Sequence, residues 1–286
     1  MTPPLDRRLN AYRPDLADIR LKDQVFAPRY VEAEPARINV PVAAIRPRPE
    51  ADSSIDTEVL FGETLSMFER MDGWAWVQLD SDHYVGYVDE TVLVDGPNDA
   101  THVVAAPRSF VYPGADLRFP PEHALSMASR VKVTGTALTR GTEYALLDDG
   151  SAMIAGHLLP VGEIANDDPV SVAALFLNTP YLWGGRSGFG IDCSGLVQMA
   201  LAMTGKSAPR DSDQQAAHLG EEIDPARDGL MRGDLVFWKG HVGFLEDEQT
   251  LLHASGGTMS VTREPLQAAI DRIATLYGEP TGYRRP

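Results

Sequence analysis

The chain has 286 residues, of which 43% are hydrophobic, and its formal net charge is −16. This composition predicts a folded protein of roughly one to three domains and excludes an intrinsically disordered chain. The acidic excess argues against general binding to nucleic acid or to anionic membranes. The single cysteine, Cys193, cannot form an intramolecular disulfide.

The amino-terminal stretch, residues 1–36, is rich in proline, arginine and aspartate. It predicts an extended arm with one short helix around residues 15–22. The arm lacks the apolar core that a signal peptide needs, and no part of the chain approaches the roughly 20 apolar residues of a membrane span. We therefore expect a cytoplasmic protein without a membrane span.

Two regions of short apolar runs follow the arm. Residues 37–98 contain runs such as INVPVAAIR, WAWVQL and YVGYV, separated by polar turns such as MDG. Residues 99–160 repeat this texture with more glycine and alanine. Short strands at this spacing predict two small all-β barrels, of which the second is divergent.

Residues 161–286 combine helices with strands. Asp168 followed by Pro169 is typical of a helix start. Apolar residues then recur at helical spacing from Cys193 to Met203, and Gly205 can end that helix. Further expected elements are a helix with a capping box at Ser212, strands at 234–238, 241–246 and 250–255, and a last helix at 264–273. Helices first and antiparallel strands later predict an α+β domain.

The solitary cysteine stands at the start of a predicted helix. Free N–H groups and the positive end of the helix dipole favour the thiolate, so we expect a lowered thiol pKa. Gly195 costs this helix about 1 kcal/mol relative to alanine, which indicates that something approaches the backbone closely there. His241 and His253 lie on consecutive predicted strands that can bring the imidazoles side by side, one as base and one to orient it. This chain order of Cys, His and a polar third residue is that of papain-like hydrolases.

Five blocks of the sequence resemble the NlpC/P60 family of cell-wall cysteine peptidases over roughly residues 168–286. In chain order they read YLWGGRSGFGIDCSGLVQ, APRDSDQQ, MRGDLVFW, GHVGFLE and LLHAS. The two β regions resemble bacterial SH3-type domains, most clearly in LFGETLSMFERMDGWAWVQLDSDHYVGYV. The resemblance implies two SH3-like barrels, residues 37–98 and 99–160, followed by an α+β, papain-like NlpC/P60 catalytic domain, residues 161–286.

The resemblance also implies roles for individual residues. Cys193 would be the nucleophile, His241 the base and His253 the residue that orients it. Tyr181 matches a family tyrosine that helps to hold the oxyanion, with the Cys193 backbone N–H as the second donor. Positions that line the substrate groove in similar enzymes are occupied here by Trp183, Asp192, Ser194 and Ser212.

Family members with this arrangement cleave small murein peptides between γ-D-glutamate and a diamino acid. We expect this hydrolysis, without a metal or other cofactor, in the recycling of murein peptides. In three-domain relatives an acidic residue and a tyrosine of the first SH3-like domain bind the free amino end of the peptide. Glu63 and Tyr84 are the candidates, since an ammonium group needs a carboxylate. The expected partner is a murein peptide with a free amino-terminal L-Ala.

Two alternatives remain open at this point. Cys193, His241 and His253 could ligate zinc in a hydrolytic site, although paired spacings such as HxxxH are absent. The chain could also be a non-catalytic cell-wall-binding protein, but such a protein has no need of the complete Cys-His-His set. Arg210 either meets a substrate carboxylate or pairs with a nearby aspartate such as Asp192.

Overall fold

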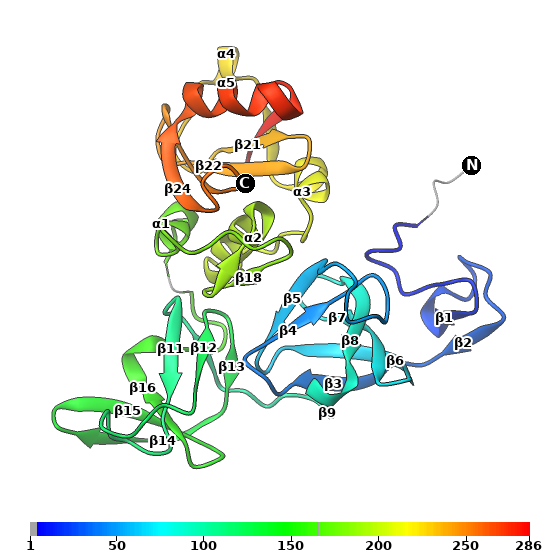
Figure 1. Ribbon diagram of the computed structural model, residues 1–286, viewed down its shortest axis with the longest axis vertical. Helices are drawn as coiled ribbons and strands as arrows, with labels where there is room; N and C mark the ends of the chain where they lie inside the picture. Colours follow the sequence, from blue (N-terminus) through cyan, green and yellow to red (C-terminus); the bar gives the residue numbers. More distant parts are fainter. Residues whose placement is uncertain (1–4, 165) are drawn as a thin grey trace. The chain divides into compact units, whose positions relative to one another are not determined.

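The computed structural model describes residues 5–164 and 166–286 of the chain (Figure 1). The chain divides into two units, one up to Val161 and one from Gly162 onward. The amino-terminal unit consists of strands and 3-10 turns, whereas the carboxy-terminal unit combines helices with an antiparallel sheet. No helix in the described ranges is long and apolar enough to cross a membrane.

The amino-terminal arm packs against the sheet that follows it. Ala11 of the arm is buried against Phe68 and Trp76 of that sheet. In place of the helix expected around residues 15–22, a short strand leads into a single 3-10 turn, which the Asp18 carboxylate caps. The elements of the arm are β1 (Leu16–Asp18), η1 (Ile19–Leu21) and β2 (Arg29–Val31), and β1 pairs in parallel with β2.

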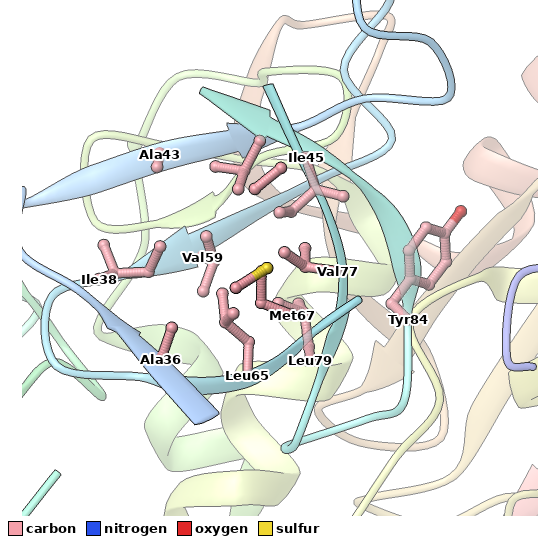
Figure 2. Close-up of a cluster of buried hydrophobic side chains, with 12 residues drawn as sticks. Ala36, Ile38, Ala43, Ile45, Val59, Leu65, Met67, Val77, Leu79 and Tyr84 are labelled. Atoms are coloured by element: carbon pink, nitrogen blue, oxygen red, sulfur yellow. The ribbon is translucent and has the colours of Figure 1, made fainter. Parts of the chain in front are cut away.

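A five-stranded antiparallel sheet forms most of the first predicted barrel region. Its order is β8-β7-β6-β3-β9, and the hairpin β4-β5 contributes to the same core. Figure 2 shows side chains from both, among them Ile38, Ile45, Leu65 and Val77, gathered in one buried cluster. The elements are β3 (Glu34–Ile38), β4 (Val42–Ile45), β5 (Thr57–Leu60), β6 (Thr64–Met71), β7 (Trp74–Leu79), β8 (Val85–Asp89), η2 (Glu90–Val92) and β9 (Leu93–Asp95).

The second β region has a separate core built on smaller sheets. Their orders are β13-β10-β17, β11-β12 and β14-β15-β16, with antiparallel pairing throughout. Val104, Val111, Leu125 and Met153 are buried between them. The elements are β10 (His102–Val104), β11 (Arg108–Val111), β12 (His123–Ser126), β13 (Arg130–Val131), β14 (Val133–Thr139), β15 (Thr142–Leu147), β16 (Ala152–Ile154), η3 (Ala155–His157) and β17 (Leu158–Pro160).

The carboxy-terminal unit has the predicted α+β layout. Its helices are α1 (Pro169–Ala174), α2 (Cys193–Met203), α3 (Ser212–His218), α4 (Pro225–Asp228) and α5 (Leu266–Tyr277). Its strands are β18 (Arg186–Ser187), β19 (Gly190–Ile191), β20 (Glu221–Ile223), β21 (Leu235–Trp238), β22 (His241–Leu245), β23 (Thr250–Ser255), β24 (Ser260–Pro265) and β25 (Gly282–Arg285).

A six-stranded antiparallel sheet, in the order β20-β25-β21-β22-β23-β24, forms the centre of this unit. Figure 1 shows α2 and α5 on opposite sides of it. Trp238 and Leu251 pack on the α5 side, in one cluster with Ile273 of that helix. Trp238 pairs with His241, and Leu251 lies two residues before His253. Because side chains alternate between faces along a strand, both imidazoles project on the α5 side.

The start of α1 and both ends of α2 agree with the sequence. Asp168 caps α1 and Pro169 occupies its first turn, as predicted. The helix ends at Ala174. The backbone N–H groups of the next three residues each donate to the carbonyl three positions earlier, as in a 3-10 turn, and not to the carbonyl four positions earlier. Helix α2 covers the predicted range and ends before Gly205, whose φ of 77° is readily adopted by glycine.

Helix α3 differs from its predicted start. Asp211 is the N-cap, Ser212 is the first helical residue, and the N-cap side chain makes no capping bond. The side-chain Nε2 of Gln215 instead donates to the backbone carbonyls of Ser194 and Pro209, at 3.0 and 2.8 Å. The capping box predicted on Ser212 is therefore wrong, because Gln215 ties α3 to the start of α2.

Candidate active site

The residue before the cysteine holds the start of α2 in place. Asp192 is the N-cap, and its Oδ1 accepts a hydrogen bond from the N–H of Gly195 at 2.7 Å. Its Oδ2 accepts one from the N–H of Gly184 at 2.9 Å, which ties the preceding glycine loop to the helix. Cys193 is thus the first residue of the helix, as the sequence predicts, and Asp192 anchors the helix start to the glycine loop.

A buried ion pair adds to this anchor. The Arg210 side chain, which is 1% exposed, donates to both carboxylate oxygens of Asp192, at 2.6 and 3.0 Å. It also donates to the Ser194 hydroxyl at 2.9 Å. Of the two roles left open for Arg210, the pairing with Asp192 is the one observed. Asp192 and Ser194 are both buried, and their predicted contacts with substrate stay predictions.

Gly195 lies where the helix and the glycine loop meet. A Cβ at this position would overlap with the carbonyl oxygen of Gly185. That carbonyl accepts a hydrogen bond from the N–H of Asp192 at 3.0 Å, which limits how far the loop can move. The close approach inferred from the sequence is confirmed, and the approaching group is the protein's own backbone.

The Cys193 thiol is buried, with the residue 5% exposed. Burial, followed by the negative charge of Asp192, raises the pKa of the thiol to about 12. The N–H groups of Val242 and Ser194 and the charge of Arg210 act in the opposite direction without offsetting this. The prediction of a lowered thiol pKa is therefore wrong. The helix start favours the thiolate, but the loss of contact with water outweighs that effect.

The two predicted histidines lie side by side. The Val242 N–H reaches the Cys193 sulfur, which places the thiol beside the start of β22, where His241 stands. His241 Nε2 lies 2.7 Å from His253 Nδ1, and the two rings are inclined at 71°. Burial, followed by electrostatic repulsion from His253 and Arg272 when these side chains carry a charge, lowers the pKa of His241 to about 3. The His241 imidazole is therefore neutral at neutral pH.

Two further residues, which sequence reasoning missed, continue this line of contacts. His253 is 1% exposed, and its Nε2 lies 2.7 Å from Oε1 of Glu264 on β24. Arg272 of α5 forms an ion pair with the same carboxylate. The hydrogen bond with His253, together with Arg272, lowers the pKa of Glu264, so the carboxylate is ionised. Only the strand register could have pointed to Glu264 in advance. His253 pairs with Thr262, and Glu264 follows Thr262 two positions later on the same face of the sheet.

Tyr181 lies on the segment that leads into the glycine loop. Its N–H donates to the Met259 carbonyl at 2.9 Å, and it forms a β-bridge with Ile191, two residues before Cys193. Burial, followed by the charges at Cys193 and Asp192, raises the pKa of Tyr181. Its hydroxyl thus keeps its proton at neutral pH and can donate a hydrogen bond close to the sulfur.

A cavity of about 510 Å³ opens beside the two imidazoles. Four of the predicted site residues line it, namely Tyr181, Trp183, His241 and His253. Trp183 is 67% exposed, so it forms an open wall rather than part of the core. Lys239 and Arg272 also line the cavity, and no carboxylate from the described ranges does. The cavity wall therefore carries two cationic side chains, of which Arg272 is paired with Glu264 and Lys239 adds a further positive charge.

The other predicted substrate-binding residues have contacts within their own folds. Glu63 and Tyr84 are buried in the amino-terminal unit. The Glu63 carboxylate accepts a hydrogen bond from the N–H of Leu60 at 2.7 Å, and Tyr84 borders the core cluster that Figure 2 shows. Ser212 opens α3. Binding of substrate by these three residues stays a prediction.

The zinc alternative has no support in this geometry. Within the described part of the chain, no group of three or more His, Cys, Asp or Glu side chains is arranged to hold a metal ion. His253 contacts His241 through one ring nitrogen and Glu264 through the other, so both nitrogens are already engaged.

Comparison with known proteins identifies two domains. Residues 178–274 match the NlpC/P60 family, and residues 45–93 match the bacterial dipeptidyl-peptidase SH3 domain. The chain carries an NlpC/P60 cysteine peptidase domain. The resemblance inferred from the sequence is confirmed, and the protein is an enzyme of the peptidase class rather than a non-catalytic binder. The SH3 match lies within the first β region, and an SH3-like fold for the second stays a prediction.

Two relatives are similar to this chain along most of its length. The γ-D-glutamyl-L-lysine dipeptidyl-peptidase of Bacillus cereus is 26% identical over 242 residues, which cover 75% of this chain and 71% of that protein. The enzyme of the same name from Bacillus subtilis is 28% identical over 224 residues, 73% of this chain and 72% of its own. A crystal structure of an NlpC/P60 family protein from Bacillus cereus has the same fold, with a TM-score of 0.72 at 21% identity, covering 88% of this chain and 99% of that one.

Proposed function

We propose that this NlpC/P60 enzyme hydrolyses the bond between γ-D-glutamate and a diamino acid in peptides derived from peptidoglycan. One observation carries the proposal: the Cys193 thiol begins α2 beside β22, where His241 is hydrogen-bonded to His253. The substrate class is supported by the names of the two relatives, both γ-D-glutamyl-L-lysine dipeptidyl-peptidases.

In the proposed reaction the Cys193 sulfur attacks the γ-carbonyl carbon of the D-glutamyl residue while His241 takes the thiol proton. Because His241 uses Nε2 toward His253, Nδ1 is the nitrogen left for the thiol. The oxyanion receives hydrogen bonds from the Cys193 N–H and the Tyr181 hydroxyl. His241 then returns the proton to the departing amine, and a water molecule, deprotonated by His241, hydrolyses the thioester.

The charge states of the resting site decide how the first step begins. Burial disfavours both the thiolate and the imidazolium, since it raises the pKa of Cys193 and lowers that of His241. The resting pair is therefore an uncharged thiol and an uncharged imidazole. Proton transfer then accompanies the attack on the carbonyl, and His241 acts as a general base rather than as the partner of a stored thiolate.

The cavity beside the histidines suits an anionic peptide. Murein peptides carry carboxylates on D-glutamate and on the diamino acid, and Lys239 and Arg272 face the cavity. An ammonium and a guanidinium bind carboxylates through charge-assisted hydrogen bonds. We therefore assign the cavity to the part of the substrate that leaves as the diamino acid product.

We propose the boundaries 37–98 and 99–160 for two SH3-like domains and 161–286 for the peptidase domain. In this arrangement Glu63 and Tyr84 select a peptide with a free amino-terminal L-Ala. We also propose a role in the recycling of murein peptides. It is supported by the names of the two relatives, because a dipeptidyl-peptidase is an enzyme that acts on peptides.

The test uses two defined peptides, L-Ala-γ-D-Glu-L-Lys and L-Ala-γ-D-Glu-meso-diaminopimelate, each with a free and an acetylated amino end. We expect release of the diamino acid from the free peptides, detected by mass spectrometry, and much slower release from the acetylated ones. The Cys193→Ala variant should lose about 10³-fold or more in kcat while its circular dichroism is unchanged. Undiminished turnover by Cys193→Ala would refute the assignment.

A further inference from the structure

The contacts of His253 form a line that runs from a carboxylate to the catalytic base. Glu264 Oε1 lies 2.7 Å from His253 Nε2, and His253 Nδ1 lies 2.7 Å from His241 Nε2. Both distances are those of good hydrogen bonds. Each bond needs one donor and one acceptor, and each neutral imidazole has one of each. The proton positions along the line are therefore linked.

An ionised carboxylate can only accept a hydrogen bond. Arg272 forms an ion pair with Glu264 from the other side, and an arginine side chain keeps its charge at any pH of interest. The carboxylate consequently stays ionised and takes the acceptor role toward His253. His253 is 1% exposed, so bulk water does not reach its Nε2 as an alternative hydrogen-bond partner.

We propose that Glu264 is a positioning residue that sets the tautomers of both histidines and so presents the basic nitrogen of His241 to the Cys193 thiol. Glu264 accepts from His253 Nε2–H, which leaves His253 Nδ1 with a lone pair. That lone pair accepts from His241 Nε2–H, which leaves the lone pair of His241 on Nδ1. The proposal rests on the proposed function for its kinetic consequences, but the tautomers themselves can be observed without a substrate.

The same line stabilises the charge that forms during the reaction. When His241 Nδ1 takes the thiol proton, the ring becomes a cation that already donates from Nε2 to His253. His253 in turn donates to the Glu264 carboxylate, so the new positive charge lies two hydrogen bonds away from a fixed negative one. No proton needs to leave His253 in this step, and Glu264 remains ionised throughout.

The packing supports a role in alignment as well. Glu264 is on β24, His253 on β23 and His241 on β22, so the three side chains come from three neighbouring strands. Gly243 lies on the same face, and a Cβ there would overlap with the Cβ of His253. The absence of a side chain at Gly243 leaves room for the Cβ of His253 and for the Leu251 side chain beside it.

The first experiment observes the histidine nitrogens of the intact protein by ¹⁵N NMR, with the His241 and His253 signals assigned through His→Gln variants. At a pH at which both rings are neutral, we expect each ring to carry its proton on Nε2. In Glu264→Leu, which keeps the side-chain size but removes the acceptor, the His253 proton should move to Nδ1 in a large fraction of molecules. His253 protonated on Nδ1 in the unaltered protein would overturn the proposal.

The second experiment compares kinetics. Glu264→Leu should lower kcat by about 10–10²-fold with little change in KM, as expected for a group that supports a catalytic residue rather than the substrate. Glu264→Gln keeps a carbonyl acceptor and should recover most of kcat. A folded Glu264→Leu variant with full kcat would also overturn the proposal.

The matched control is Glu246→Leu. Glu246 pairs with Arg263 of β24 as Glu264 pairs with Arg272, but it contacts neither histidine. This variant should keep both the tautomers and kcat, so a loss shared by the two leucine variants would mean a structural effect. If neither the unaltered protein nor any variant cleaves the peptides while the NMR result is as expected, the proposed function fails and the tautomer assignment stands.

Discussion

The Cys193 thiol and its surroundings lead to a test of how the nucleophile is activated. With its pKa raised to about 12 by burial, the thiol is mostly protonated between pH 5 and 9. The rate of alkylation by iodoacetamide should rise about tenfold per pH unit over this range, because only the thiolate reacts. The rate is measured by quenching the alkylation at set times and determining the modified fraction of Cys193 by mass spectrometry.

Glutathione is the reference for this measurement, since its rate levels off above the ordinary thiol pKa of about 8.5. A fast, constant rate at pH 5–7 would indicate a stored thiolate–imidazolium pair and would contradict the neutral resting site. The lowered pKa of His241, about 3, leads to the same expectation. The imidazole becomes charged only well below pH 5, so above pH 5 no imidazolium is present to stabilise a thiolate.

Tyr181 gives a second test on a single side chain. Its hydroxyl keeps its proton and is close enough to Cys193 to be influenced by its charge. Tyr181→Phe removes one donor to the oxyanion and should lower kcat by about 10²–10³-fold, with a smaller effect on KM. Steady-state kinetics on the defined peptides measure both constants.

Tyr283→Phe is the control for this change, because Tyr283 is a partly buried tyrosine on β25 that does not line the cavity. Its kcat should stay within about twofold of the unaltered enzyme. Equal losses in the two variants would assign the effect of Tyr181→Phe to packing and not to the oxyanion.

Helix α2 and the glycine loop act together as one element of the site. Gly195→Ala places a Cβ against the Gly185 carbonyl, which the Asp192 N–H holds in place. Overpacking of this kind costs about 1–3 kcal/mol, more than the roughly 1 kcal/mol that alanine gains over glycine within a helix. We expect a lower free energy of unfolding in urea and a reduced kcat, because the helix start carries Cys193.

The comparison for this variant is Gly282→Ala, where a Cβ would meet no atom within 4 Å. It should change the unfolding free energy by no more than about 0.5 kcal/mol. A Gly195→Ala protein as stable as Gly282→Ala would show that the loop yields freely.

The molecule as a whole is strongly acidic, with a net charge of −16, yet its cavity is lined by Lys239 and by Arg272, which is paired with Glu264. A negative protein repels an anionic peptide over about 10 Å at 0.1 M salt, so the local cations matter most for capture. Lys239→Gln should lower kcat/KM for the diaminopimelate peptide several-fold at low salt, and by less at 0.5 M salt.

Lys206→Gln serves as the control for net charge. Lys206 follows the carboxy-terminal end of α2, whereas Cys193 lies at the opposite end. The substitution removes the same charge far from the cavity and should leave kcat/KM nearly unchanged. If both variants lose activity equally, the overall charge and not the cavity governs capture.

Most of the proposed catalytic set could be predicted because it depends on local patterns and short connections. Helical periodicity located α2 with Cys193 at its start, and the short turn expected between β22 and β23 allowed His241 and His253 to lie side by side. The alternation of short apolar runs likewise predicted the strands of the first β region. These features follow from residues that are close together in the chain, so a single sequence carries them.

Three features depended on strand register, on the choice of ion-pair partner and on burial, which a single sequence does not fix. Glu264 reaches His253 only because the turn between β23 and β24 pairs His253 with Thr262, and a shift of one residue would turn the carboxylate to the other face. Arg210 could have met either substrate or aspartate until the fold placed it against Asp192. The thiol pKa was misjudged since a helix start is visible in a sequence, whereas the burial that outweighs it arises when separate segments close over the sulfur.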